Sequence, residues 1–446
     1  MEFKTVTELN DSLKGCVERD GEECRVTDSS VLAGDLIDRI VYTAVHGESA
    51  VLRNEARAII KAIANAQGIR SDSIQGLYEA MGRGECEGFT VPAINIRGLT
   101  YDSARAVFRA ALKNNAAAFI FEIAKSEIGY TEQRPVEYTA CILAAAIKEG
   151  YKGPVFIQGD HFQINASKYE ADKSAEITAL KELIKEAVEA EFYNIDIDSS
   201  TIVDLSREEV IDQQRPNFEV TAVLTSYIRE LEKDGITISV GGEIGEVGKK
   251  NSTEEELRAF MDGFLNIVGE RFPGISKISV QTGTSHGGVV LPDGSIASVK
   301  VDFDTIELLT KVAKEYGMSG VVQHGASTLP DDAFHIFAEK GASEVHLATG
   351  FQNMIYDSDS FPQELKTEIY EHLKTAHKDE WGEGVTEEQF LYKTRKKGFG
   401  PFKKKMWDLP TDIKTAIGKE LEDRFVYLFE KLKAVNNADV VKKYVG

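Results

Sequence analysis

Eight short runs of β-branched and aromatic residues alternate with helical segments through the middle of this chain. The runs cover residues 89–94, 117–123, 154–158, 193–197, 236–240, 278–281, 320–323 and 344–347. Such alternation is typical of βα units that surround a parallel sheet. Eight consecutive units predict one (β/α)8 barrel, the TIM barrel of the α/β class, rather than two dinucleotide-binding halves.

The chain continues well beyond this alternating region at both ends. Residues 1–87 are polar and helical in pattern, with an amphipathic segment at 55–66, and predict an N-terminal helical extension. Residues 88–356 form the expected barrel. Residues 357–446 predict a C-terminal helical region, and the sequence leaves open whether this tail caps the barrel or contacts another subunit.

Composition and charge exclude several kinds of partner. Apolar residues make up 42% of the chain, no apolar run approaches the length of a membrane span, and the first residues lack a signal-peptide pattern. We therefore expect a cytoplasmic protein that has no membrane partner. The net charge of −21 also disfavours non-specific binding to nucleic acid.

One basic run near the C-terminus departs from this acidic background. Its members are Lys393, Arg395, Lys396, Lys397, Lys403, Lys404 and Lys405. A solvated loop is the simplest interpretation of such a run. The alternative is a loop that contacts a substrate phosphate, and neutralising Lys403, Lys404 and Lys405 would then weaken binding of a bisphosphate more than binding of a monophosphate.

Functional side chains follow several of the predicted strands, where a barrel of this kind carries its chemistry. Asp160 and His161 follow the third run, Glu243 the fifth, His286 the sixth and His324 the seventh. The chain has only eight histidines, so three at strand ends are hard to attribute to chance. Imidazole and carboxylate groups together make up the ligand set of a catalytic zinc site with an open position for substrate.

The remaining candidates are weaker. The glycines beside His286 and His324 would let backbone N–H groups approach a bound anion. His346 lies within the eighth run and points either to the core or to the site, and periodicity alone does not decide which. A Schiff-base aldolase would need a buried lysine in the barrel mouth, where the strand ends offer mainly Lys125, which is more simply a rim lysine.

The order of these motifs, Asp-His, Glu in a glycine-rich segment, His-Gly and His-Gly-x-Ser, resembles the class II (metal-dependent) ketose-bisphosphate aldolases. The similarity covers about residues 88–356 and rests on the joint order and spacing of the motifs. The resemblance implies that Asp160 is the catalytic residue. It also implies four metal ligands, a candidate ligand for a second metal, and four groups that bind phosphate. The four ligands are His161, Glu243, His286 and His324, the second-metal candidate is Asp198, and the phosphate-binding residues are Gly287, Gly325, Ser327 and Thr349.

The chain also departs from the family pattern at several positions. Gln158 stands where the family has histidine, Ala124 where it often has serine, and His346 and Ala348 where its strand-eight motif has asparagine and aspartate. Lys250 and Asn251 occupy the spacing of the acidic pair in the mobile loop after Glu243. Glu246 or one of Glu254, Glu255 and Glu256 could replace this pair, although the segment from Ser252 to Glu255 also fits a helix capping box.

The resemblance implies a metal-dependent aldolase that reversibly cleaves fructose 1,6-bisphosphate to dihydroxyacetone phosphate and glyceraldehyde 3-phosphate. Zinc, or another divalent transition metal such as Co²⁺ or Fe²⁺, is the implied cofactor, and a monovalent cation is a further candidate. The implied partners are a phosphorylated sugar and other copies of this chain in a homodimer or larger homo-oligomer. Two alternatives stay open: an aldolase for tagatose bisphosphate or another ketose phosphate, and a non-catalytic barrel subunit.

Overall fold

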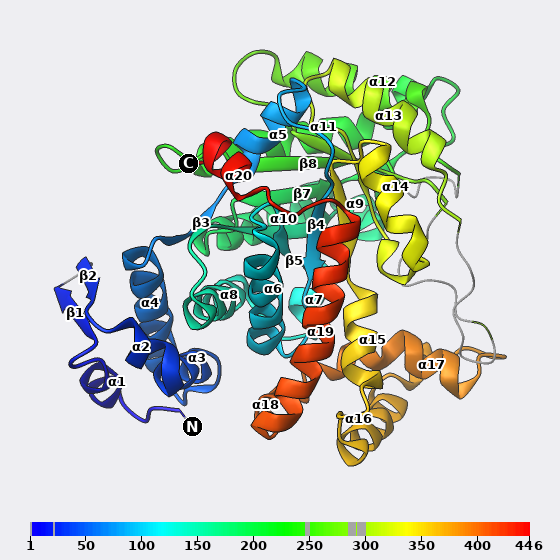
Figure 1. Cartoon of the computed structure of the whole chain (residues 1–446). Coiled ribbons are helices and arrows are strands. Elements are labelled where there is room, and N and C mark those ends of the chain that lie inside the picture. The colour runs from blue at the N-terminus through cyan, green and yellow to red at the C-terminus, as the bar shows by residue number, and fades with distance from the viewer. Residues whose placement is uncertain (1, 21–22, 246–249, 284–290, 292–299) are drawn as a thin grey trace.

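The computed structural model describes residues 2–20, 23–245, 250–283, 291 and 300–446 (Figure 1). Eight parallel strands form a closed ring in which each strand pairs with the next along the chain, and the last pairs with the first. They are β4 (Val91–Asn95), β5 (Ile120–Ala124), β6 (Gly153–Gln163), β7 (Asn194–Asp198), β8 (Ser239–Glu243), β9 (Lys277–Val280), β10 (Val321–Gln323) and β11 (Glu344–Leu347). All eight predicted runs overlap these strands, although β8 begins three residues later than predicted, and the predicted TIM barrel is confirmed.

Helices follow the strands and cover the outside of the ring (Figure 1). They are α6 (Thr100–Asn114), α7 (Lys125–Tyr130), α8 (Pro135–Glu149), α9 (Ala166–Ala171), α10 (Lys173–Glu189), α11 (Val210–Leu231), α12 (Glu254–Val268), α13 (Phe303–Glu315), α14 (Phe334–Glu339) and α15 (Thr349–Asp357). The helix α12 begins with the capping box, one residue later than the sequence suggested, because Thr253 and Glu256 exchange hydrogen bonds with each other's backbone.

The N-terminal segment is not purely helical, so that prediction was wrong in part. It contains the hairpin β1 (Val17–Asp20) and β2 (Glu23–Val26), and β3 (Ile69–Asp72) pairs in parallel with the start of β6 as a ninth strand. These strands carry few apolar side chains, so they lack the apolar runs by which the barrel strands were predicted. The helices here are α1 (Val6–Ser12), α2 (Ser29–Val31), α3 (Ile37–His46), α4 (Ala50–Ala66) and α5 (Gln75–Gly82).

The C-terminal tail packs on the barrel of its own chain. The helix α19 (Thr411–Lys431) lies along α6, and α20 (Ala438–Tyr444) lies beside α5 (Figure 1). Asn437 Oδ1 accepts hydrogen bonds from the backbone N–H groups of Ala117 and Ala118, 2.7 and 3.1 Å away, just before β5. The other tail helices are α16 (Gln363–Ala376), α17 (Glu387–Thr394), the 3₁₀ turn η6 (Arg395–Gly398) and α18 (Lys403–Trp407).

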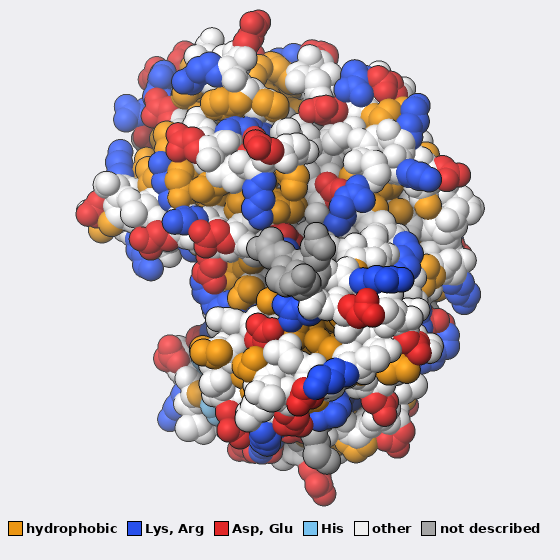
Figure 2. Space-filling view, turned by 90° about the vertical axis from the view of Figure 1, so that its left-hand side faces the viewer, with side chains coloured by type: hydrophobic (Ala, Val, Ile, Leu, Met, Phe, Trp, Pro, Cys, Tyr) orange, Lys and Arg blue, Asp and Glu red, His pale blue; other side chains and the backbone are white. Residues whose placement is uncertain are grey.

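The surface of the N-terminal side carries acidic and basic side chains in mixture, with small apolar areas between them (Figure 2). Within the described part of the chain, no helix combines the length and apolar character that a membrane span requires.

Candidate active site

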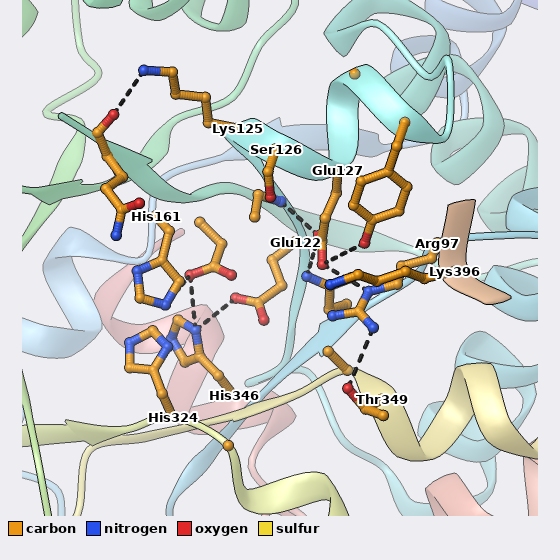
Figure 3. Close-up of a pocket in the computed structure, with 18 of the residues that line it drawn as sticks. Arg97, Glu122, Lys125, Ser126, Glu127, His161, His324, His346, Thr349 and Lys396 are labelled. Carbon is orange, nitrogen blue, oxygen red and sulfur yellow. Dashed lines mark hydrogen bonds and ion pairs between the residues drawn. The ribbon is translucent and has the colours of Figure 1, made fainter. Parts of the chain in front are cut away.

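A cavity of about 540 Å³ opens at the carboxyl ends of the barrel strands. Its walls come from β4, β5, β6, β10 and β11, from α7, and from the distant turn η6 (Figure 3). The predicted residues Asp160, His161, His324, Gly325, Ser327 and Thr349 all line it. Two other predicted residues, His286 and Gly287, lie outside the described residues, as does Glu246.

A break in the strand β6 brings Asp160 and His161 to the same site. The register of β6 against β7 shifts between Gly159 and Phe162, and His161 has φ of 40°, in the left-handed region. Consecutive residues of a regular strand point to opposite faces, whereas a bulge redirects a side chain. Because of this bulge, the carboxylate of Asp160 and the imidazole of His161 both face the cavity.

Asp198, the candidate second-metal ligand, contacts the imidazole of His161. Its Oδ2 lies 3.0 Å from His161 Nδ1 and 2.6 Å from Gln163 Nε2, and its Oδ1 accepts hydrogen bonds from Ser200. Burial alone would raise the pKa of Asp198, but the hydrogen bond from His161 lowers it. No group of potential metal ligands among the described residues includes Asp198. A carboxylate on Nδ1 fixes the imidazole so that Nε2 is left to bind a metal.

His324 follows β10 and stands beside His161, with ring centroids 4.2 Å apart. Its Nε2 lies 2.9 Å from Ser279 Oγ and 3.5 Å from Glu243 Oε2. The ligand atoms of Asp160, His161 and His324 are all within 4.8 Å of one another. Two imidazoles and a carboxylate that converge in this way fit a divalent transition metal, with Glu243 next to them.

His346 points into the site and not into the apolar core (Figure 3). Its ring centroid lies 4.1 Å from that of His324, and its Nδ1 is 3.1 Å from Glu122 Oε2 and 3.2 Å from Asp160 Oδ1. Its Nε2 is 2.5 Å from Glu344 Oε1. Burial alone would lower the pKa of His346, but these carboxylates raise it well above its usual range.

A layer of buried charge lies beneath His346 inside the barrel, and the sequence analysis missed it. Lys277 Nζ contacts Glu344 Oε1 at 2.6 Å, Gln158 Oε1 at 2.7 Å and Asp196 Oδ1 at 3.0 Å. Burial opposes a charge on Lys277, but Asp196 and Glu344 raise its pKa, which favours the ammonium form over the neutral amine that a Schiff base requires. Burial raises the pKa of Asp196 to about 6.

The buried layer left a signal in the sequence. Charged residues interrupt apolar strand runs at Glu122, Asp196 and Glu344. Such residues are rarely fully buried without partners, so charges in three strands of one barrel indicate a polar interior. The rim lysine interpretation of Lys125 agrees with the structure, since its Nζ binds the carbonyl of Gln163 and the carboxylate of Glu176.

One wall of the cavity carries groups that suit an anion. Gly325, Ser327 and Thr349 line it together with the guanidinium of Arg97, whose Nη1 lies 3.3 Å from Thr349 Oγ1. Burial disfavours the charge of Arg97, but Glu127, 2.7 Å away, raises its pKa.

The basic run contributes one residue to this wall, Lys396 on η6. Burial, and then Arg97, lower the pKa of Lys396. Lys403, Lys404 and Lys405 do not line the cavity of their own chain, and they pair with Glu137, Asp408 and Glu368 respectively. Within the chain, Lys396 is therefore the member of the basic run that reaches the cavity.

Fold and site together define a (β/α)8-barrel protein with a buried candidate metal centre. The model of the class II fructose-bisphosphate aldolases matches residues 77–401, and the chain belongs to that family. No curated protein matches the sequence.

Several solved structures are similar to this chain at low sequence identity. A fructuronate-tagaturonate epimerase from Cohnella laeviribosi shares 10% identity over 94% of this chain and 93% of its own, with a TM-score of 0.62. A probable tagatose 6-phosphate kinase from Sinorhizobium meliloti shares 15% identity over 79% and 93%, with a TM-score of 0.50. A fructose-bisphosphate aldolase from Campylobacter jejuni shares 16% identity over 83% and 97%, with a TM-score of 0.47. The epimerase, aligned over nearly all of both chains, shows the barrel fold.

Proposed function

We propose that this chain is a divalent-metal-dependent aldolase that cleaves a ketose carrying two phosphates, with fructose 1,6-bisphosphate as the first candidate. The products are then dihydroxyacetone phosphate and glyceraldehyde 3-phosphate. The observation that carries the proposal is the convergence of Asp160, His161 and His324 within 4.8 Å at the cavity that also holds the anion-binding wall.

His161 and His324 would hold the metal, with Glu243 beside them and His286 as the ligand that the family pattern implies. When bound, a divalent metal acts as a Lewis acid that disperses the negative charge developing on the ketose carbonyl oxygen. Zinc is the first candidate, and Co²⁺ and Fe²⁺ suit the same imidazole and carboxylate donors.

Asp160 is the base in this proposal. It would take the proton from the hydroxyl whose carbon becomes the aldehyde, so that the electrons of the O–H bond form the new C=O bond as the C–C bond breaks. In the condensation direction, Asp160 returns the proton to the same oxygen. Its buried position at the cavity supports this role, because a base must lie within hydrogen-bond reach of the proton that it removes.

The cavity wall that carries Arg97 and Lys396 is consistent with a substrate that has two phosphates. Gly325, Ser327 and Thr349 would bind the phosphate of the ketose half, while Arg97 and Lys396 offer charge for an anion in the same cavity. Lys396 has no carboxylate within ion-pair distance among the residues that the structure describes, which leaves its charge available to a ligand.

An assay of the purified protein tests the proposal directly. Fructose 1,6-bisphosphate and its C4 epimer, tagatose bisphosphate, are supplied with and without a chelator, and triose phosphate release is measured. We expect cleavage that stops on chelation and returns with Zn²⁺, Co²⁺ or Fe²⁺. The altered strand-eight residues His346 and Ala348 make the epimer the main alternative. Fructuronate, which appears in the name of the epimerase that shares the fold, is supplied as a third compound. Conversion of fructuronate without cleavage of either bisphosphate would indicate a different class of substrate.

Asp160→Asn separates chemistry from metal binding. Asp160 is the proposed base, and the proposed metal ligands His161 and His324 are unchanged in this variant. We therefore expect turnover to fall about 1,000-fold or more while the metal stays bound. Metal content is measured by mass spectrometry, and the surface variant Asp423→Asn is the control. Cleavage at the wild-type rate by Asp160→Asn would contradict the assignment, and a folded wild-type protein that binds no metal would favour a non-catalytic subunit.

A further inference from the structure

His346 lines the cavity and lies between the proposed base Asp160 and Glu344, a member of the charged layer inside the barrel. Only 4% of the residue is exposed. One ring nitrogen, Nδ1, contacts Asp160 and Glu122, and the other, Nε2, contacts Glu344. The imidazole therefore joins the proposed base to Glu344, which does not line the cavity.

Both ring nitrogens of His346 face carboxylates. Nε2 faces Glu344 at 2.5 Å and Nδ1 faces Asp160 at 3.2 Å. An ionised carboxylate can only accept hydrogen bonds, so a ring nitrogen that faces one acts as a donor. His346 can therefore hold the Asp160 carboxylate through Nδ1 while Glu344 holds the ring through Nε2.

The lower side of His346 is held by buried polar groups. Glu344 accepts hydrogen bonds from Gln158 Nε2 at 2.9 Å and from Lys277 Nζ at 2.6 and 2.7 Å, and the Tyr78 hydroxyl donates to it as well. Glu344 is completely buried. If the ring of His346 turned away, the fully buried carboxylate of Glu344 would lose a partner that water cannot replace, which is costly.

We propose that His346 is a positioning residue that holds the carboxylate of Asp160 toward the cavity, and that Glu344 and Lys277 fix His346 from below. The inference deepens the proposed function, since it takes Asp160 as the base of the aldol cleavage. In this part of the barrel the interior is polar, and its buried hydrogen bonds hold one catalytic side chain in place.

The physical reason is that proton transfer depends steeply on geometry. A displacement of about 1 Å at a reacting group can cost about 100-fold in rate. Asp160 Oδ1 is also 4.0 Å from His161 Nε2, the nitrogen that would bind the metal. Without the Nδ1 donor of His346, the carboxylate could turn toward that metal and lose its orientation toward the substrate hydroxyl.

Kinetics of three variants test this role with the metal-loaded protein and the best substrate of the assay above. His346→Leu removes both donors, and we expect kcat to fall about 100-fold with KM within about threefold of wild type and with unchanged metal content. His346→Asn places an amide N–H near the position of Nδ1, and we expect it to recover about tenfold of this loss. Glu344→Gln leaves Asp160 and His346 in place but weakens the support, and we expect an intermediate kcat.

The control variant, His46→Leu, removes a half-buried histidine far from the cavity and should leave kcat unchanged. A wild-type kcat in His346→Leu, or a loss that follows metal content instead, overturns the proposal. If His346→Leu does not fold, the kcat values of His346→Asn and Glu344→Gln test the proposal. A wild-type kcat in both variants would overturn the positioning role of His346.

A crystal structure of the His346→Asn and His346→Leu variants separates this inference from the proposed function. We expect the Asp160 carboxylate to keep its place in His346→Asn and to rotate away in His346→Leu. This readout needs no substrate, so it stands even if no ketose phosphate is cleaved. An unmoved Asp160 in His346→Leu would show that His346 does not position it, whatever the activity of the wild type.

Discussion

At the scale of single residues, the site depends on a local departure from regular strand geometry. His161 adopts a φ of 40°, which costs free energy for a residue with a side chain. The bulge that holds it is possible because Gly159 has no side chain: a Cβ there would lie 2.5 Å from the ring of Phe162. Phe162 is fully buried and cannot move aside cheaply.

Gly159→Ala should therefore damage the site without touching a proposed ligand. We expect the variant to lose about 1 to 3 kcal/mol of stability, because an added methyl in a packed interior forces a shift. The same shift displaces His161, so affinity for Co²⁺ should fall, as measured by titration of the visible absorption of the bound ion. Gly382→Ala, at an exposed glycine where a Cβ would meet its nearest neighbour at 3.5 Å, is the control. Wild-type Co²⁺ affinity in Gly159→Ala would contradict this account of the bulge.

At the scale of elements, the turn η6 brings the distant C-terminal region to the barrel mouth. Two close approaches fix it: the ring of Phe399 packs against Gly98, and Gly400 packs against the carbonyl of Tyr130. A side chain at either glycine would clash with its neighbour, so the fit depends on both. The consequence is that Lys396, about 50 residues beyond the last barrel strand, lines the cavity.

Lys396→Met should weaken binding of a doubly charged substrate. If Lys396 contacts the second phosphate, KM for the bisphosphate should rise about tenfold, equivalent to about 1.4 kcal/mol, with kcat little changed. KM for the corresponding ketose monophosphate should not change. Lys405→Met is the matched control, since Lys405 pairs with Glu368 outside the cavity. An equal rise in KM for the bisphosphate and the monophosphate would show that Lys396 does not bind the second phosphate.

At the scale of the whole molecule, the N-terminal extension and the C-terminal tail are bound to each other beside the barrel. His46 on α3 packs between Tyr42 and Trp407 of α18, with ring centroids 4.9 and 5.3 Å away. Tyr42 also donates a hydrogen bond to Asp408. Burial, followed by the nearby Lys403 and Lys404, lowers the pKa of His46 to about 4.

This depressed pKa should make the protein less stable in mild acid. Above about pH 6.5 His46 is neutral in both the folded and the unfolded chain and contributes no pH dependence. Between about pH 6.5 and 4 the unfolded chain takes up a proton that the folded chain excludes, so stability falls as the pH falls. His46→Leu should remove about 1 kcal/mol of the loss between pH 7 and pH 5 in urea unfolding, a value reduced for solvent screening because the side chain is only half-buried. Parallel pH profiles of the two proteins would contradict the prediction.

Much of the barrel was predictable because its determinants are local. β-Branched runs of four to seven residues, separated by amphipathic helical patterns, specify strands and helices one by one, and eight of them in order specify the ring. The position of Asp160, His161, Glu243 and His324 at one rim followed from the same pattern, because parallel strands all end on the same side of the barrel. The short strands of the N-terminal segment were missed because most of their side chains are charged or polar and form no apolar run.

The sequence by itself determined the barrel and the rim on which its chemistry lies. Only the tertiary structure decided that His346 faces Asp160, that Lys277 lies buried beneath it, and that Lys396 alone of the basic run reaches the cavity. In a strand, a polar residue between apolar neighbours points to one of two faces, and closure of the ring selects which face is inside. The place of Lys396 depends on contacts between residues far apart in the chain, which no local pattern records.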